Sequence, residues 1–304
     1  MKLLTPFLIA ILCIPTIQAA PSLWEFEVTE KWVDLVEERA PEKPQVAPKK
    51  KRTALVFSLM TGFKHWCTPH TTEMIRILGE KTGAYDVVIS DDISNFEKDK
   101  IKQFDLIFLN NTCSERDERH LFYDVLKDMD KARVLEQNLL DHVASGAGLV
   151  AIHGGIVMLN NSPAFSDMLG GSFDFHPRQQ TVVGKLVDKE HPITSAFDGT
   201  DLVHYDEPYM FKNAYKNLDF HPLLQMELNP DKKTLDDKRY QAVLETGLPL
   251  YISWIKRHGK GRVFYCSPSH NAQSFEQPEL LQFILNGIQY AAGDLDCDDT
   301  PLSK

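Results

Sequence analysis

The stretch GLVAIHGG, at residues 148–155, is the part of this 304-residue chain that decides the expected fold. Its first five residues are small or branched and apolar, as in a buried strand, and they end abruptly at His153, Gly154 and Gly155. A junction of this kind exposes one side chain at the carboxyl edge of an α/β sheet, where related sheets carry a nucleophilic Ser or Cys. An imidazole there is not the usual acyl-transfer nucleophile, but it can act as a base or bind a metal ion.

Strands and helices alternate outward from this stretch. The expected strands of the first half are 53–58, 86–90, 105–110 and 149–153, with helices at 71–83 and about 118–144. The second half is more irregular, with expected strands at 181–187, 223–228, 248–255 and 262–267 and a closing helix at 275–292. The order predicts an α/β fold with a doubly wound, mostly parallel sheet, helices on both faces and an irregular, strand-containing second half.

The sequence divides into segments of different character. Residues 1–20 have the positive charge, apolar run and small-residue exit of a cleaved signal peptide, which predicts a secreted or periplasmic protein. Residues 21–52 contain an expected amphipathic helix over 24–39 and a linker rich in Pro and Lys. The main domain is expected to span 53–293, and residues 294–304 form an acidic tail with no packing signal.

Charge and hydropathy exclude several classes of partner. The formal net charge of −10 argues against nucleic acid, because phosphate binding needs a basic face. The apolar run near the start is short and interrupted by Pro6 and Pro15, so no membrane span is expected. Leu12 stands before Cys13 where a lipoprotein usually has a small residue, which disfavours a lipid anchor.

The cysteines beyond the expected signal peptide are widely spaced, at Cys67, Cys113, Cys266 and Cys297. Without a CxxC pair, a structural zinc knuckle is not expected. Cys67 and Cys113 follow strands that would be neighbours in the sheet, so a disulfide and two unpaired thiols both stay open, with the unpaired thiols favoured.

Polar residues gather just after the expected strands and in the long connections between them. The clusters are 62–65, 110–112, 153–155, 170–177, 204–209 and 267–271. In a doubly wound sheet, the loops after the first, third, fourth and last strands open on the same edge. We therefore expect His65, His153 and His270 to converge on one cleft.

Imidazoles that converge with a carboxylate have two chemical uses, and the sequence leaves both open. They can hold a divalent metal ion that polarises a carbonyl or activates water. Without a metal, they can exchange protons near neutral pH. A lone loop histidine is more often a hydrogen-bonded structural residue, which remains an alternative for His65 and His176. For His153, the two following glycines indicate close approach by a ligand or by backbone.

Taken in order, six segments of the chain resemble the ThuA-like (trehalose utilisation) family: ALVFSLMTGFKH, GAGLVAIHGG, LGGSFDFHP, HPIT, YDEPYMF and GKGRVFYCSPSHN. That family belongs to the class I glutamine-amidotransferase-like superfamily, so the resemblance implies a flavodoxin-like fold over 53–293. Amidotransferases of the superfamily carry a nucleophilic Cys where this chain has His153, and glutamine hydrolysis is therefore not expected. Family members are linked to the metabolism of trehalose and other glycosides, alongside oxidoreductases that form 3-keto sugars.

The resemblance also implies which residues line the pocket, namely His65, His153, His176, Glu207 and His270. We assign catalytic roles, and the ligands of a divalent metal such as zinc or manganese, to His153, Glu207 and His270. The expected substrate-binding residues are His65, Asn111, Gly154, Gly155, His176, Asp206 and Tyr209. Ser269 departs from the family, which often has glycine directly before this histidine, and this puts the local backbone shape in question.

These residues predict an exported enzyme that acts on a small-molecule carbohydrate, with no nucleotide cofactor. In a 3-keto-glycoside the C3 carbonyl acidifies the C2 proton, which His153 or Glu207 would remove. A metal ion or His270 would stabilise the enediolate, the C1 substituent would leave, and addition of water would complete a net hydrolysis. A non-catalytic carbohydrate-binding or accessory protein and a metal-independent hydrolase or isomerase remain alternatives, and homo-oligomer formation stays open.

Overall fold

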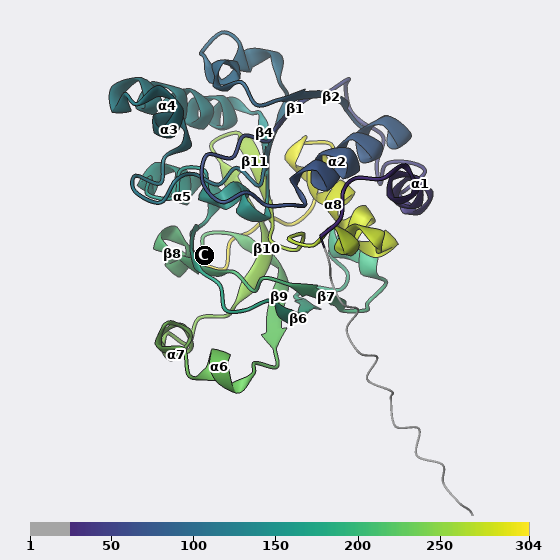
Figure 1. Ribbon diagram of the computed structural model, residues 1–304. Helices are drawn as coiled ribbons and strands as arrows, with labels where there is room; N and C mark the ends of the chain where they lie inside the picture. The colour runs from purple at the N-terminus through teal and green to yellow at the C-terminus, as the bar shows by residue number, and fades with distance from the viewer. Residues whose placement is uncertain (1–24, 304) are drawn as a thin grey trace, which may run out of the picture.

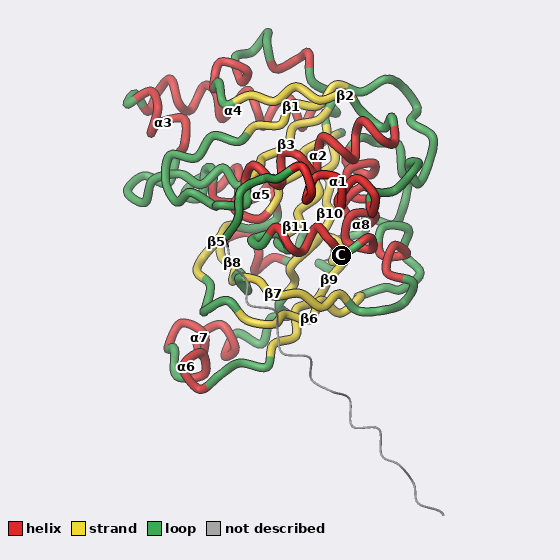
Figure 2. Tube along the Cα trace, turned by 45° about the vertical axis from the view of Figure 1, so that its right-hand side comes forward, coloured by secondary structure: helices red, strands yellow, loops and turns green. Residues whose placement is uncertain are grey.

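The computed structural model describes residues 25–303, and within them a nine-stranded sheet runs through the centre of the molecule (Figures 1 and 2). In spatial order its strands are β2 (Asp86–Ser90), β1 (Thr53–Phe57), β3 (Leu106–Asn110), β4 (Gly148–Ile152), β11 (Gly261–Cys266), β10 (Tyr251–His258), β9 (His221–Leu228), β6 (Gln180–Leu186) and β7 (Leu202–Asp206). The strands from β2 to β11 pair in parallel, and those from β11 to β7 pair antiparallel. A small separate sheet joins β5 (Ser172–Phe175) to β8 (Met210–Lys212).

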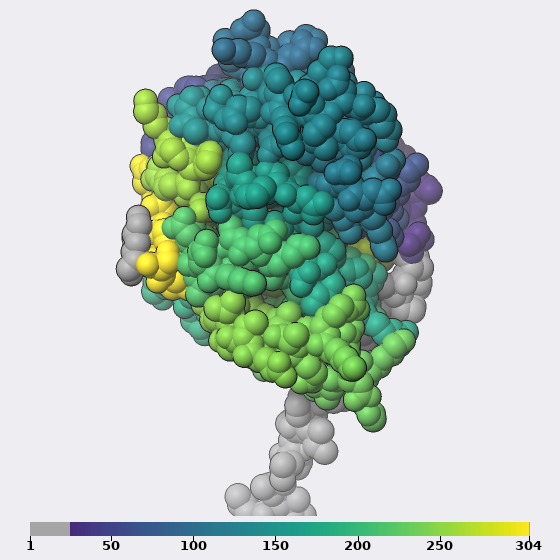
Figure 3. All heavy atoms as spheres, turned by 90° about the vertical axis from the view of Figure 1, so that its left-hand side faces the viewer, coloured from purple at the N-terminus to yellow at the C-terminus, as the bar shows by residue number. Residues whose placement is uncertain are grey.

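Helices cover both faces of this sheet, which confirms the predicted fold class (Figure 1). On one face lie α1 (Glu30–Arg39), α2 (Thr68–Thr82) and α8 (Pro278–Ala291), and on the other α3 (Leu121–Leu126), α4 (Met129–Ser145) and α5 (Pro163–Leu169). The short helices α6 (Lys232–Leu235) and α7 (Lys238–Glu245) project beyond the sheet at one end of the molecule (Figures 1 and 3). Single 3₁₀ turns are η1 (Ile93–Phe96), η2 (Ile101–Gln103), η3 (His153–Val157), η4 (Thr194–Phe197), η5 (Asn213–Asn217) and η6 (Ala272–Glu276).

The central parallel strands β1, β3 and β4 are almost entirely apolar because both of their faces are buried. In β4, Val150 and Ile152 pack into the core on the α8 side, whereas Leu149 and Ala151 pack into the core under α4 and α5. Successive side chains of a strand point to opposite faces, so a strand between two helical layers needs an unbroken apolar run. This requirement is why these strands were recognisable in the sequence.

The helix predicted at about 118–144 is in fact two helices. Lys127 adopts a left-handed conformation with φ of 51° and closes α3. The side chain of Asp128 then accepts a hydrogen bond from the backbone N–H of Lys131 and begins α4. The predicted N-terminal helix is also shorter than expected, because Thr29 caps α1 at Glu30.

The acidic tail packs against the domain, although no packing signal was recognised in its sequence. Asp294 is buried and its carboxylate lies 2.6 Å from the guanidinium of Arg52. Leu295 is also buried, and the side chain of Asp299 accepts a hydrogen bond from the hydroxyl of Tyr290.

Two further predictions concern export and the thiols. The predicted signal peptide, residues 1–20, lies outside the described residues, and none of the helices in 25–303 is long and apolar enough to cross a membrane. Cys67 and Cys113 are both buried and free.

Candidate functional site

The turn after β4 places His153 in an unusual backbone conformation at the carboxyl edge of the sheet. Its φ is 45°, in the left-handed region that side chains rarely adopt, and the chain turns directly from the strand into η3. The expectation that this side chain is exposed is wrong, because the relative exposure of His153 is 0%. The ring of Tyr209 packs over the imidazole, with 4.2 Å between the ring centroids.

The two glycines after His153 allow neighbouring chain segments to approach closely. A Cβ atom on Gly154 would lie 2.8 Å from both the Cys113 sulfur and a ring carbon of His65. A Cβ atom on Gly155 would lie 2.1 Å from the carbonyl oxygen of Leu109. The sequence left open whether the two glycines allow close approach by a ligand or by the backbone. In the structure they allow close approach by neighbouring parts of the protein.

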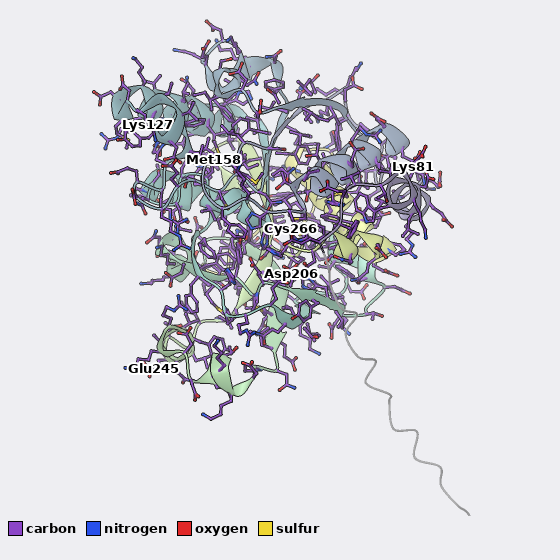
Figure 4. The ribbon with its side chains drawn as sticks, in the orientation of Figure 1. Lys81, Lys127, Met158, Asp206, Glu245 and Cys266 are labelled. Carbon is purple, nitrogen blue, oxygen red and sulfur yellow. The ribbon has the colours of Figure 1, made fainter. Side chains whose placement is uncertain are left out.

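Three histidines and a glutamate form a buried cluster: His65, His153, Glu207 and His270, with one ligand atom of each within 4.8 Å of the others. The histidines follow β1, β4 and β11, as predicted from the common edge of the parallel strands. Glu207 follows β7, whose end lies near that of β11 at the centre of the molecule, where Figure 4 labels Asp206 and Cys266. The convergence expected for the three histidines is thus confirmed. These donors can hold a metal ion.

The hydrogen bonds of the cluster leave lone pairs facing one another. Nδ1 of His153 lies 2.8 Å from the carbonyl oxygen of Ser267, and it must donate because that oxygen only accepts. Nε2 of His153 then faces a carboxylate oxygen of Glu207 at 3.4 Å and Nδ1 of His270 at 3.2 Å. With neutral imidazoles, at most one proton lies among these three atoms. A bound cation, either an additional proton or a metal ion, would offset the repulsion between the Glu207 carboxylate and the imidazole lone pairs.

Burial and neighbouring charges set the protonation of the cluster. Burial would raise the pKa of Glu207, but the contacts of its carboxylate with the imidazoles of His153 and His270 outweigh burial and hold that pKa well below its usual range. Burial lowers the pKa of His270, yet its hydrogen bond to Glu207 dominates and raises it. Burial, reinforced by the neighbouring imidazoles, lowers the pKa of His65 well below its ordinary value. These directions favour an ionised Glu207 and an uncharged His65, the forms that bind metals, whereas a metal ion held by His270 would have to displace a proton.

Asp206 organises the cluster from behind. One oxygen of its buried carboxylate accepts from the backbone N–H of Ser269 at 2.8 Å, and the other accepts from that of Glu207 at 2.7 Å. Ser269 has a φ of 147°, within the range that favours glycine, so the hydrogen bond to Asp206 holds a conformation that glycine adopts freely. Asp206 was predicted to bind substrate, but its carboxylate is occupied by the backbone.

Asn111 holds the backbone of the turn after β4, as Asp206 holds the backbone at Ser269 and Glu207. Its side-chain oxygen accepts from the backbone N–H of Gly154 at 3.2 Å, and the residue is fully buried with a φ of 55°. Like Asp206, Asn111 was predicted to bind substrate, and the structure instead places it where it fixes the backbone.

A cavity of about 220 Å³ lies beside the cluster. Of the predicted site residues, His65, His176, Glu207 and Tyr209 line it, whereas His153 and His270 lie deeper. Residues that the sequence analysis did not select also line it, notably Phe63, Phe173, Arg116 and Arg119. A signal for the arginines was available, because they lie in the same loop after β3 as the polar cluster at 110–112.

His176 lines the cavity beside the carboxylate of Glu207. Its Nε2 lies 3.6 Å from the second oxygen of Glu207, and its Nδ1 donates to the carbonyl oxygen of Pro177 at 2.8 Å. The imidazole stacks on Tyr209 and its side chain is 35% exposed, unlike those of the buried histidines. Its Nε2 lone pair is therefore directed toward the carboxylate beside the cavity.

Comparisons with known proteins agree with this architecture. The family model described as ThuA, trehalose utilisation, matches residues 53–291. The solved structure of a ThuA-like protein from Bacteroides uniformis ATCC 8492 is 16% identical, with a TM-score of 0.56, over 83% of this chain and 93% of that one. A ThuA-like protein from Parabacteroides merdae ATCC 43184 is 18% identical, with a TM-score of 0.56, over 84% of this chain and 96% of that one.

At these identities the structural likeness establishes the fold alone. A comparison with curated proteins gave no match. The family model, by contrast, spans most of the sequence, including every member of the histidine and glutamate cluster. The chain therefore belongs to the ThuA, trehalose utilisation, family.

Proposed function

We propose that this protein is a metal-dependent enzyme that cleaves 3-keto-glycosides. The observation that carries the proposal is the convergence of three imidazoles and one carboxylate at the side of a small cavity. The family's association with trehalose utilisation supports a carbohydrate as the substrate.

His65, His153, Glu207 and His270 would hold the ion. Nitrogen and carboxylate ligands of this kind suit zinc, and manganese is a second candidate. The hydrogen bond from His153 to the Ser267 carbonyl resembles the outer interactions that orient metal-binding imidazoles. A bound ion would supply Lewis-acid polarisation of a substrate carbonyl.

The cavity suits a single sugar ring. Its volume of about 220 Å³ is below the range of roughly 300–1,000 Å³ typical of pockets for drug-sized ligands. The aromatic side chains of Phe63, Phe173 and Tyr209 line it and offer apolar surface to the C–H groups of a sugar. The imidazole of His176 and the carboxylate of Glu207 offer polar contacts to the sugar oxygens.

His176 is the best-placed general base. It lines the cavity, its Nδ1 proton is held by the Pro177 carbonyl, and protonation at Nε2 would be stabilised by Glu207. In the proposed reaction Nε2 takes the C2 proton, and the electron pair moves onto the C3 oxygen as an enediolate. The pair then returns to form the C1–C2 double bond while the bond from C1 to the glycosidic oxygen breaks. The leaving oxygen takes the proton back from His176.

Water then adds across the new double bond, with hydroxide to C1 and a proton to C2, and the sum is hydrolysis of the glycoside. This assignment differs from the sequence-based one, in which His153 or Glu207 was the base. The change follows from burial, because His153 is fully buried and does not line the cavity, and from the low pKa of Glu207, which makes its carboxylate a weak base.

The test is release of the aglycone from a synthetic 3-keto-glycoside by the purified protein. We expect release in the presence of zinc or manganese, loss of activity with a chelator, and recovery when the metal is restored. His176→Ala should retain metal and lose turnover. No product under any metal condition would contradict the proposal and would favour a carbohydrate-binding protein without catalysis.

We also propose that the protein is exported, on the basis of the signal-peptide pattern of residues 1–20. Expression of the full chain followed by mass measurement of the secreted or periplasmic product tests this. A product lacking about the first 20 residues is expected, and an uncleaved protein retained in the cytoplasm would contradict export.

A further inference from the structure

Two arginines of the loop between β3 and α3 face the cavity without an anionic partner. Arg116 and Arg119 line the same hollow as His176 and Glu207, and neither forms an ion pair or hydrogen bond within residues 25–303. Six other arginines of the described chain pair with carboxylates: Arg39, Arg52, Arg76, Arg239, Arg257 and Arg262. In a chain with a net charge of −10, two guanidinium groups without an ion pair at one cavity form a local cationic site.

The acidic residues of the same loop do not neutralise them. The sequence from 114 to 119 is SERDER, so carboxylates alternate with the arginines. Glu115 is directed to Lys127, at 3.7 Å, and Glu118 lines a different hollow between α4 and α5. Asp117 is exposed and forms no ion pair among the described residues. None of the carboxylates of this loop therefore pairs with Arg116 or Arg119 among the described residues, and Glu207 is the one carboxylate that lines the cavity with them.

The backbone of this loop is fixed on both sides of the arginines. The backbone N–H of Glu115 donates to Asp124 at 2.8 Å, and the hydroxyl of Ser114 donates to the Val157 carbonyl at 2.9 Å. At the other end, the side-chain amide of Asn161 donates to the Glu118 carbonyl at 3.0 Å. These contacts fix the backbone from which the side chains of Arg116 and Arg119 reach the cavity.

We infer that the substrate carries an anionic group, a carboxylate or a phosphate, which Arg116 and Arg119 bind while the sugar ring lies against Glu207 and His176. A guanidinium presents paired donors that match the oxygens of a carboxylate or phosphate. The overall negative charge of the chain would repel such a ligand, so a local cationic site is required for it to enter. The inference rests on the proposed function only in taking the ligand to be a sugar.

The test compares binding of D-glucuronate, D-glucose 6-phosphate and D-glucose by calorimetry, with the metal-loaded full chain at low and high salt. We expect one or both acidic sugars to bind about tenfold or more tightly than D-glucose, and salt to reduce that difference. The sugar acid and the sugar phosphate in separate titrations distinguish the two anions.

The variants Arg116→Gln and Arg119→Gln should weaken binding of the acidic sugars far more than binding of D-glucose, so that the preference for acidic sugars is lost. Arg133→Gln is the matched control, because Arg133 is also unpaired and exposed but lines the other hollow. Equal affinities for acidic and neutral sugars, no sugar binding at all, or a preference that survives in the double variant would each overturn the inference. Tight binding of an acidic sugar without turnover of any 3-keto-glycoside would instead reject the proposed reaction and retain the anion site.

Discussion

His153 adopts a backbone conformation that costs on the order of 1–3 kcal/mol for a residue with a side chain. The surroundings enforce it, since the N–H of the next residue is held by Asn111 and the ring by Ser267 and Tyr209. The same conformation presents the nucleophile in related α/β sheets. In this chain it directs the imidazole toward Glu207 and His270, and so the turn contributes to the cluster.

Replacing Gly155 tests how tightly this turn is packed. The added methyl group of Gly155→Ala would lie 2.1 Å from the Leu109 carbonyl, and backbone must shift to relieve the clash. We expect a loss of about 3 kcal/mol or failure to fold. Gly184→Ala is the control, because its nearest neighbour is 3.5 Å away. Urea denaturation gives both values, and equal stabilities would show that the turn tolerates the methyl group.

Asp206→Asn tests whether the buried carboxylate positions the cluster. The amide cannot accept on both sides, so the backbone N–H of either Ser269 or Glu207 loses its partner. We expect zinc or manganese affinity to fall about 10- to 100-fold, as for outer residues of other metal sites, with the circular dichroism spectrum retained. Unchanged metal affinity in calorimetry would show that Asp206 does not position the cluster.

At the scale of elements, α1 is joined to α2 through an aromatic cluster around His70. The rings of Phe26, Trp32 and Trp66 contact this imidazole edge-on, with centroid distances of 4.7 to 5.2 Å. Burial lowers the pKa of His70 from 6.5 to about 4. Between these values the unfolded chain binds the proton more tightly than the native chain, so native stability falls as the pH decreases from about 6.5 to 4.

His70→Phe should therefore be less sensitive to acid than the natural protein. Between pH 7 and pH 4.5, the free energy of unfolding of the natural protein should fall by at least about 1 kcal/mol more than that of His70→Phe. Denaturation series at the two pH values measure the difference, with the pH 7 stabilities as the baseline. Identical pH dependence in the two proteins would show that His70 does not contribute.

The elements that could be predicted from the sequence are those whose environment imposes a simple pattern. The central parallel strands β1, β3 and β4 are apolar because both of their faces are buried, and α8 is recognisable from its apolar run. The break between α3 and α4 was missed because it depends on one left-handed residue, Lys127, and a cap at Asp128. The short strands β5, β7 and β8 were missed because none of them has a clear apolar run, and β5 and β8 pair only with each other across a long connection.

At the scale of the whole molecule, the acidic tail is anchored through Asp294 to Arg52, which directly precedes β1. Asp294→Asn should cost about 3 kcal/mol, because the Arg52 guanidinium would be left buried without its closest carboxylate. Asp296→Asn removes an exposed partner of Arg262 and should cost less than about 1 kcal/mol. Thermal denaturation of the two variants measures the difference, and equal losses would contradict a structural role for the buried pair.

The meeting of the histidines could be predicted because it follows from topology, since parallel strands end at one edge of the sheet. The burial of the cluster could not be predicted, because the burial of His153 depends on Tyr209. Tyr209 lies in the connection after β7, the strand at the opposite edge of the sheet from β2. The roles of Asp206 and Asn111 also depend on hydrogen bonds to backbone that are distant in sequence. The resemblance to the family selected Glu207, but the structure was needed to show which residues of the site line the cavity and which do not.

The most direct test of the account is the divalent metal content of the purified full chain. Elemental analysis and calorimetry with zinc and manganese should give about one ion per chain for the natural protein and for His142→Gln, a control remote from the cluster. His153→Ala and Glu207→Gln should bind the ion at least about 10-fold more weakly while remaining folded. Absence of metal binding in the natural protein, or binding that is unchanged in both cluster variants, would contradict the central claim.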